Sequence, residues 1–125
     1  MWWGFLNTPE HMAHDLYYYG PFSIAVSAGN ECWMFYSSGI LSSANGCPTS
    51  IDHGVAVVGI DRTGVTPYWI VQNSWGDGWG KNGFIHLAVE EGVGISGMNQ
   101  YAEYIDVDGT YPLPPSCPNS DVDES

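Results

Sequence analysis

Two stretches of sequence decide the fold: IDHGVAVVG at residues 51–59 and YWIVQNSWGDGWG at residues 68–80. Valine dominates the first stretch, and the second begins with aromatic and β-branched residues, so both favour strands. We expect these strands at residues 55–60 and 68–73. The segment DRTG at residues 61–64 has the composition of a tight turn. Together these patterns predict an antiparallel hairpin.

The turn also predicts a register for this hairpin. If residues 62–64 form a three-residue loop with its glycine in the left-handed conformation, Asp61 pairs with Val65. Continuing this pairing along the strands places His53 directly opposite Asn73. Opposed Cβ atoms lie about 4.5–5.5 Å apart, so a hydrogen bond between the two side chains is within reach. A bulge or a longer turn would change this register.

Trp75 follows Asn73 by two residues, and we expect its side chain to lie on the same face. It would then shield the contact between His53 and Asn73 from water. The alternative interpretation is an ordinary polar pair across two strands, without any chemical role.

Weaker signals predict one helix and several further strands. Thr8 and Pro9 are typical of the cap and first position of a helix, which we expect to end near Tyr19, before Gly20. Further strands are expected at residues 22–28, 84–89 and 102–107, and a short helical or irregular piece at residues 31–37. The expected fold class is α+β, with an antiparallel, barrel-like sheet and an N-terminal helix.

The domain is expected to span residues 1–107. Residues 108–125 contain four prolines and end in a cluster of acidic residues, which is typical of an extended tail or linker. The whole chain has 125 residues, of which 44% are hydrophobic, so one domain with a real core can form.

Charge and composition exclude several kinds of partner. Two basic residues against fourteen acidic ones give a net charge of −12, so the chain cannot neutralise phosphates of nucleic acids or of anionic membranes. No apolar run reaches the ~18–20 residues that span a bilayer. The three cysteines form no CxxC pattern, which argues against a zinc or thioredoxin-like centre. They leave open one bridge with a free thiol, or three free thiols.

The two quoted stretches resemble the histidine and asparagine motifs of the papain-like cysteine peptidases. The segments GPFSIAV at residues 20–26, GFI at 83–85 and GISGM at 94–98 continue this resemblance, which covers about residues 8–105. It implies the C-terminal, barrel half of a papain-like fold. The implied reaction is the hydrolysis of peptide bonds by Cys-His-Asn acyl transfer, with no metal and no cofactor.

The resemblance implies a role for each residue of the motifs. His53 is the catalytic base and acid, and Asn73 orients its ring. Trp75 covers their hydrogen bond, and Trp79 lines the leaving-group side. Asp52 is expected to tune the charge of the site, or else is an exposed acid of the loop. These roles agree with general chemistry, because a cysteine nucleophile needs a nearby imidazole to hold it as a thiolate.

The resemblance also implies a pocket for the second residue of a peptide substrate. Its lining residues are Ala25, Ile51 and Gly54, with Tyr101 at its base. A tyrosine at that position is expected to shorten the pocket.

The sequence departs from the family in its cysteines. The segment Gln-x-x-x-x-x-Cys-Gly-Ser-Cys-Trp, which supplies the nucleophile and an oxyanion donor, does not occur here. Cys32 precedes a tryptophan but lacks the glycine and serine context, so we do not expect it to be the nucleophile. Cys47 stands where the family places half of a disulfide, yet Ser96 stands at the partner position. Cys117 or Cys32 could take its place, or Cys47 could stay reduced.

We therefore expect the half of a papain-like endopeptidase that carries the histidine and asparagine, inactive alone because the nucleophile half is missing. Its expected partners are that helical half and a peptide or protein substrate, with no nucleic acid and no membrane. The family implies a lysosomal, vacuolar or secreted location. The alternative is a non-catalytic pseudopeptidase that serves as a binding module, or a truncated gene product.

Overall fold

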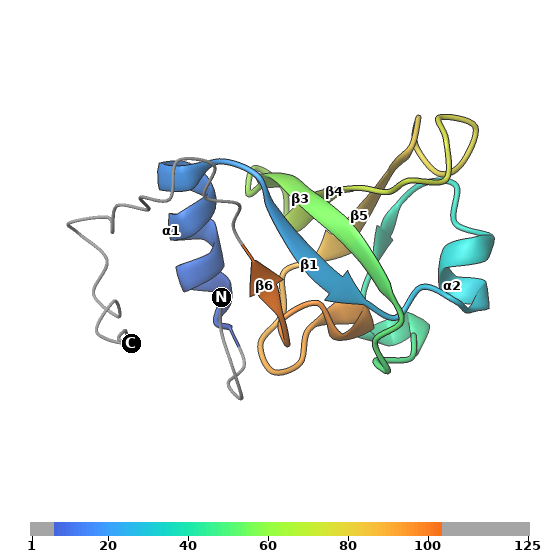
Figure 1. The fold of residues 1–125 in the computed structure, drawn as a ribbon, viewed down its shortest axis with the longest axis horizontal. Helices are drawn as coiled ribbons and strands as arrows, with labels where there is room; N and C mark the ends of the chain where they lie inside the picture. The colour runs from blue at the N-terminus through green and yellow to red at the C-terminus, as the bar shows by residue number, and fades with distance from the viewer. Residues whose placement is uncertain (1–6, 104–125) are drawn as a thin grey trace.

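The computed structural model describes residues 7–103 of the chain (Figure 1). Two α-helices, α1 (Pro9–Tyr19) and α2 (Glu31–Met34), lie at opposite ends of one sheet. Six strands form the sheet: β1 (Phe22–Val26), β2 (Ile40–Leu41), β3 (His53–Asp61), β4 (Tyr68–Gln72), β5 (Phe84–Ala88) and β6 (Ala102–Glu103). Two single-turn 3₁₀ helices complete the elements, η1 (Ser43–Asn45) and η2 (Ile95–Gly97).

The strands are ordered β2-β5-β4-β3-β1-β6. All neighbouring pairs are antiparallel except β2 and β5, which are parallel. The α+β class is confirmed. The sheet is not closed, because its edge strands are β2 and β6. The expected boundary at residue 107 and the acidic tail at residues 108–125 lie outside the described residues.

The core lies on one face of the sheet. Side chains alternate along each strand, and the buried set includes Val55 and Val57 of β3 with Trp69 and Val71 of β4. Each helix contributes one large buried side chain to this core, Met12 from α1 and Trp33 from α2. Further members of the core are Ile24, Val26, Ile85, Leu87 and Met98. The same alternation places Gly54 and the side chain of Ala56 on the outer face.

The expected helix α1 is confirmed. The Thr8 side chain accepts a hydrogen bond from the backbone N–H of His11, and Pro9 occupies the first turn, where it has no N–H to leave unpaired. The helix ends at Gly20, whose φ of +85° is accessible to glycine. The strand expected at residues 102–107 is described only as far as Glu103, and β2 was not expected at all.

The expected register of the β3–β4 hairpin is wrong. Asp61 pairs with Tyr68, not with Val65, so the connecting loop covers residues 62–67. The Asp61 carboxylate accepts hydrogen bonds from the backbone and the hydroxyl of Thr63, which begins the turn as expected. Pro67 has no N–H to donate to a neighbouring strand, so β4 begins pairing only at the next residue, Tyr68. A bulge at Val58 shifts the register once more.

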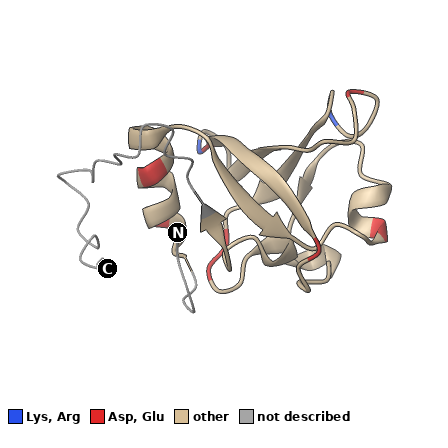
Figure 2. Cartoon of the chain, in the orientation of Figure 1, with Lys and Arg blue, Asp and Glu red and all other residues tan. Residues whose placement is uncertain are grey.

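Most Asp, Glu, Lys and Arg residues lie in the helices and loops, and few lie in the strands (Figure 2). No helix of the described part of the chain is both long and apolar enough to cross a membrane.

One polar cluster does lie on the sheet, at the end remote from His53. The rings of Tyr68 and His86 stack with centroids 4.3 Å apart, and the Tyr68 hydroxyl donates to Asp61 at 3.1 Å. Burial lowers the pKa of His86 below its usual 6.5, and the charge of Lys81 lowers it further, while Asp61 opposes both. Hydrogen bonds from Thr63 and Tyr68 lower the pKa of the Asp61 carboxyl.

We predict that protonation of His86 destabilises the fold. Its pKa is lower in the folded than in the unfolded chain, so the unfolded chain binds more protons below about pH 6.5 and stability falls as pH falls. Urea unfolding at pH 7 and pH 5 measures this loss in the native chain and in His86→Gln. The variant should lose less stability between the two pH values. Parallel losses in both proteins would contradict the prediction.

Candidate active site

His53 and Asn73 meet at the end of the β3–β4 hairpin. His53 Nε2 lies 2.8 Å from Asn73 Oδ1, and the backbone N–H of Ser74 donates to the same Oδ1 at 2.8 Å. Because a backbone N–H can only donate, the shared atom is the amide oxygen, and His53 Nε2 must carry the proton. Nδ1 of the neutral ring then holds the free lone pair. The two bonds fix both the amide orientation and the histidine tautomer.

The expected contact forms even though the expected register is wrong. Ala56 pairs with Gln72, so continuing the ladder sets Val55 against Asn73 and makes Asn73 the diagonal neighbour of His53. Diagonal Cβ atoms lie about 7–8 Å apart, within reach of a long or aromatic side chain. The register differs from expectation by two residues, and such a shift preserves the face to which each side chain points.

Trp75 packs against the imidazole of His53. The two ring centroids lie 5.4 Å apart at an interplanar angle of 33°, while 40% of the Trp75 surface stays exposed. Trp79 meets Trp75 edge to face, with centroids 5.2 Å apart. The two tryptophans expected beside the site are therefore both next to it, with Trp75 in direct contact with His53.

The loop at residues 76–83 returns the chain so that these tryptophans face the site. The backbone N–H of Asn73 donates to Gly83 O, and the N–H of Gly83 donates to Trp79 O. Gly80 lies in the left-handed region at φ +62°, and a Cβ there would approach Phe84 O to 2.6 Å. Only glycine fits this position without displacing the β5 backbone.

Asp52 binds backbone rather than the imidazole. Its carboxylate accepts hydrogen bonds from the N–H groups of Ala28 and Gly29 at 2.9–3.3 Å. The backbone N–H of Asp52 donates to Val26 O. Asp52 thus joins the end of β1 to the start of β3, one residue before His53. This contact assigns Asp52 a structural role that its sequence context did not reveal.

Three of the four expected pocket residues lie in one row on the outer face. Ala25 pairs with Gly54 across β1 and β3, and the backbone N–H of Ala25 donates to Tyr101 O on its other side. Gly54 also lines a cavity of about 480 Å³ together with Ser23, Val55, Ala56, Gln72, Asn73 and Ser74. Ile51 is half-buried and does not line this cavity.

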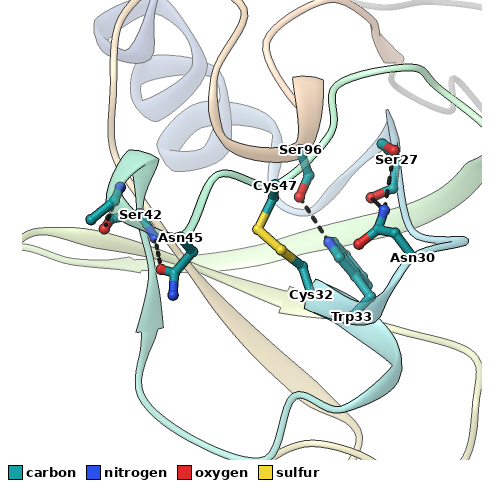
Figure 3. The surroundings of a disulfide bond; sticks show 9 residues. Ser27, Asn30, Cys32, Trp33, Ser42, Asn45, Cys47 and Ser96 are labelled. Carbon is teal, nitrogen blue, oxygen red and sulfur yellow. Dashed lines mark hydrogen bonds between the residues drawn. A yellow bond between two sulfur atoms is a disulfide. The ribbon is translucent and has the colours of Figure 1, made fainter.

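Cys32 and Cys47 form a disulfide with Cα atoms 5.9 Å apart (Figure 3). Of the pairings that the sequence left open, this one links α2 to the loop before β3. Ser96 instead accepts a hydrogen bond from Trp33 Nε1 at 2.8 Å. Neither cysteine of the bridge is a free thiol, and Cys117 lies outside the described residues.

Trp33 is the residue that sequence reasoning missed. It is fully buried and stacks on Trp79, with centroids 5.8 Å apart and planes 16° from parallel. Trp79 Nε1 also donates to Trp33 O at 2.7 Å. The sequence shows only a tryptophan within a short piece, residues 31–37, expected to be helical or irregular, and nothing in its spacing links it to residues 75–79.

The sequence profile described as papain family cysteine protease matches residues 5–105. Cysteine endopeptidase Rep1 of Oryza sativa subsp. japonica is 45% identical over 87 residues, which are 67% of this chain and 23% of that protein. The oryzain beta chain of the same species is 35% identical over 118 residues, or 90% of this chain and 25% of that protein. The chain thus spans about a quarter of these relatives.

Among solved structures, bromelain protease from Ananas comosus, in complex with the E64 inhibitor, has a similar fold. The TM-score is 0.69 at 32% sequence identity, and the match covers 78% of this chain and 45% of the bromelain chain.

We predict that Asp52→Ala destabilises the fold by about 1 kcal/mol, because two backbone N–H groups lose their acceptor. Asp52→Asn keeps one side-chain oxygen and should lose less. Asp77→Ala removes the same charge from an exposed loop and serves as the control. The measurement is the urea midpoint of each variant. Equal midpoints for Asp52→Ala and Asp77→Ala would show that the contact contributes nothing.

Proposed function

The chain belongs to the papain family of cysteine proteases, and we propose that it supplies the catalytic histidine and asparagine of a cysteine peptidase. The observation that carries this proposal is the pair of hydrogen bonds on Asn73 Oδ1. They leave Nδ1 of His53 as the basic nitrogen. A thiol brought to Nδ1 by a second segment would complete a site for acyl transfer.

Each step follows from the state of this imidazole. Nδ1 takes the proton of the thiol, and the resulting thiolate attacks the carbonyl carbon of the scissile peptide bond. The imidazolium then gives that proton to the departing amine, and an acyl-enzyme remains. In the second half, Nδ1 takes a proton from water, and the hydroxide attacks the carbonyl carbon of the thioester. The C–S bond then breaks, which releases the peptide acid and restores the thiolate. Asn73 holds Nε2 throughout and does not accept its proton, as an amide oxygen is a weak base.

The nucleophile is proposed to come from a helical half that carries the Cys-Gly-Ser-Cys-Trp segment. That segment is absent from the sequence, and Cys32 and Cys47 are bonded to each other. The exposed part of Trp75 beside His53 supports a partner on this side, because exposed apolar surface commonly marks an interface. The same half would supply the donors that stabilise the tetrahedral intermediate.

The substrate is proposed to be a peptide or a protein. Gly54, Ala25 and Tyr101 form a small, largely apolar row next to the site, and the bulk of Tyr101 favours short side chains at the position that it receives. The proposed location is lysosomal, vacuolar or secreted. The disulfide supports an oxidising compartment, since disulfides are rare in the cytosol.

We predict that this chain, joined to a papain-family half carrying Cys-Gly-Ser-Cys-Trp, reacts with an epoxide probe at the first cysteine of that segment. His53→Ala should abolish labelling and peptide hydrolysis, because losing the base can cost about a million-fold in rate. Asn73→Ala should weaken both by up to about 100-fold, since the ring is only misaligned. His86→Ala, on the remote part of the sheet, is the matched control and should label normally.

The 125-residue chain alone should hydrolyse no peptide and should show no labelling that depends on His53. Circular dichroism confirms that each variant is folded. If the joined protein reacts equally well with and without His53, the proposed catalytic role is wrong. If Cys32 of the single chain is labelled and His53→Ala abolishes that labelling, the chain is a complete peptidase without a partner half.

A further inference from the structure

Trp33 lies at the centre of the contacts between the disulfide and the candidate active site. Its helix, α2, has only four residues, and its neighbours Met34 and Phe35 are exposed at 58% and 75%. A helix this short is not stable by itself. Trp33 is nevertheless fully buried. Contacts from outside the helix must therefore hold it in place.

Two of these contacts anchor Trp33 through residues outside the candidate site. Its Nε1 donates to the hydroxyl of Ser96, which is itself buried. Cys32, the residue before it, is bonded to Cys47 in the loop that leads to β3. Figure 3 shows the disulfide and the indole–hydroxyl hydrogen bond side by side. One bond therefore fixes the indole and the other fixes the backbone.

Trp33 also contacts the two tryptophans of the site. Trp79 stacks on its ring and donates to its carbonyl oxygen. Trp75 meets it edge to face, with centroids 6.4 Å apart, and Trp75 in turn packs against His53. A continuous series of contacts thus runs from Ser96 through Trp33 to the imidazole.

This support is needed because the hydrogen bond to Asn73 does not fix the orientation of the imidazole completely. That bond fixes where Nε2 points, but the ring can still tilt about the line of the bond. Trp75 limits this tilt on one side, although Trp75 lies in an exposed loop and is itself 40% exposed. The position of Trp75 therefore depends on the buried ring beneath it, which is Trp33.

We propose that Trp33 is a positioning residue that sets the orientation of the His53 imidazole through Trp75 and Trp79. Ser96 and the Cys32–Cys47 disulfide hold Trp33 in the place from which it does so. The value of this orientation for catalysis rests on the proposed function. The orientation itself is a property of the chain and can be measured without any activity.

The test is NMR of the 125-residue chain with ¹⁵N-labelled histidine, assigned with His53→Ala. The readout is the hydrogen exchange of the His53 Nε2 proton, which the Asn73 bond and the Trp75 ring protect. Trp33→Phe and Ser96→Ala each remove one side of the indole–hydroxyl bond. Each should speed this exchange by about tenfold, the equilibrium equivalent of one hydrogen bond. The double variant should add nothing further, since both changes break the same bond.

Trp69→Phe is the matched control. Trp69 is as fully buried as Trp33 but lies in the core of β4, and its Nε1 has no hydrogen-bond partner within residues 7–103. This variant loses a similar volume without touching the series of contacts. It should leave the exchange of the His53 proton unchanged. If Trp33→Phe and Trp69→Phe change the exchange equally, Trp33 acts only through general stability and the proposal fails.

Reduction of the disulfide in the native chain gives a second, reversible measurement in case a variant does not fold. Reduction should speed exchange at His53, and reoxidation should restore it. Unchanged exchange in the reduced, folded chain would overturn the role of the disulfide. In the joined enzyme, Trp33→Phe should lower kcat with little change in KM. If the joined enzyme is inactive while the exchange responds as expected, the proposed function fails and the positioning role stands.

Discussion

The oxygen of the Asn73 side chain is the atom on which the candidate site depends. It accepts hydrogen bonds from Ser74 N–H and from His53 Nε2, both at 2.8 Å. The first bond is to the backbone next to the asparagine itself, so it sets the orientation of the amide independently of the histidine. The second then admits only the tautomer with a proton on Nε2. A rigid amide thereby determines which nitrogen of His53 is basic.

The sequence predicted this contact for a reason that was partly wrong. Alternating strands on both sides of a turn predicted the hairpin, and the parity of the alternation placed His53 and Asn73 on one face. The register was misjudged because Pro67 and the bulge at Val58 change which residues of β3 and β4 pair. The composition of the turn does not reveal this change. Parity is preserved under a shift of two residues, and this is why the contact remained correct while the register did not.

The supporting contacts could not be predicted in the same way, because they join residues that are distant in sequence. The bond between Trp33 and Ser96 spans 63 positions, and the disulfide was one of several pairings that three cysteines allow. Asp52 was expected to tune the charge of the site or to be an exposed acid of the loop. The backbone N–H groups that donate to its carboxylate, those of Ala28 and Gly29, become apparent only when the end of β1 lies beside it. Such contacts are determined by tertiary packing, to which hydrophobic periodicity and turn composition are insensitive.

The arrangement separates the parts that must be rigid from the parts that must be open. His53 is the first residue of β3, and the segment just before it is held in two places. Asp52 binds the backbone of Ala28, which precedes α2, and Cys47 is bonded to Cys32 of α2 itself. The outer face next to it carries Gly54, where an added Cβ would meet nothing within 4 Å. The contacts that orient the His53 ring, to Asn73 and Trp75, lie on the core side of β3, and Gly54 leaves the opposite face of the strand open. β3 therefore carries the oriented imidazole on one face and an open surface on the other.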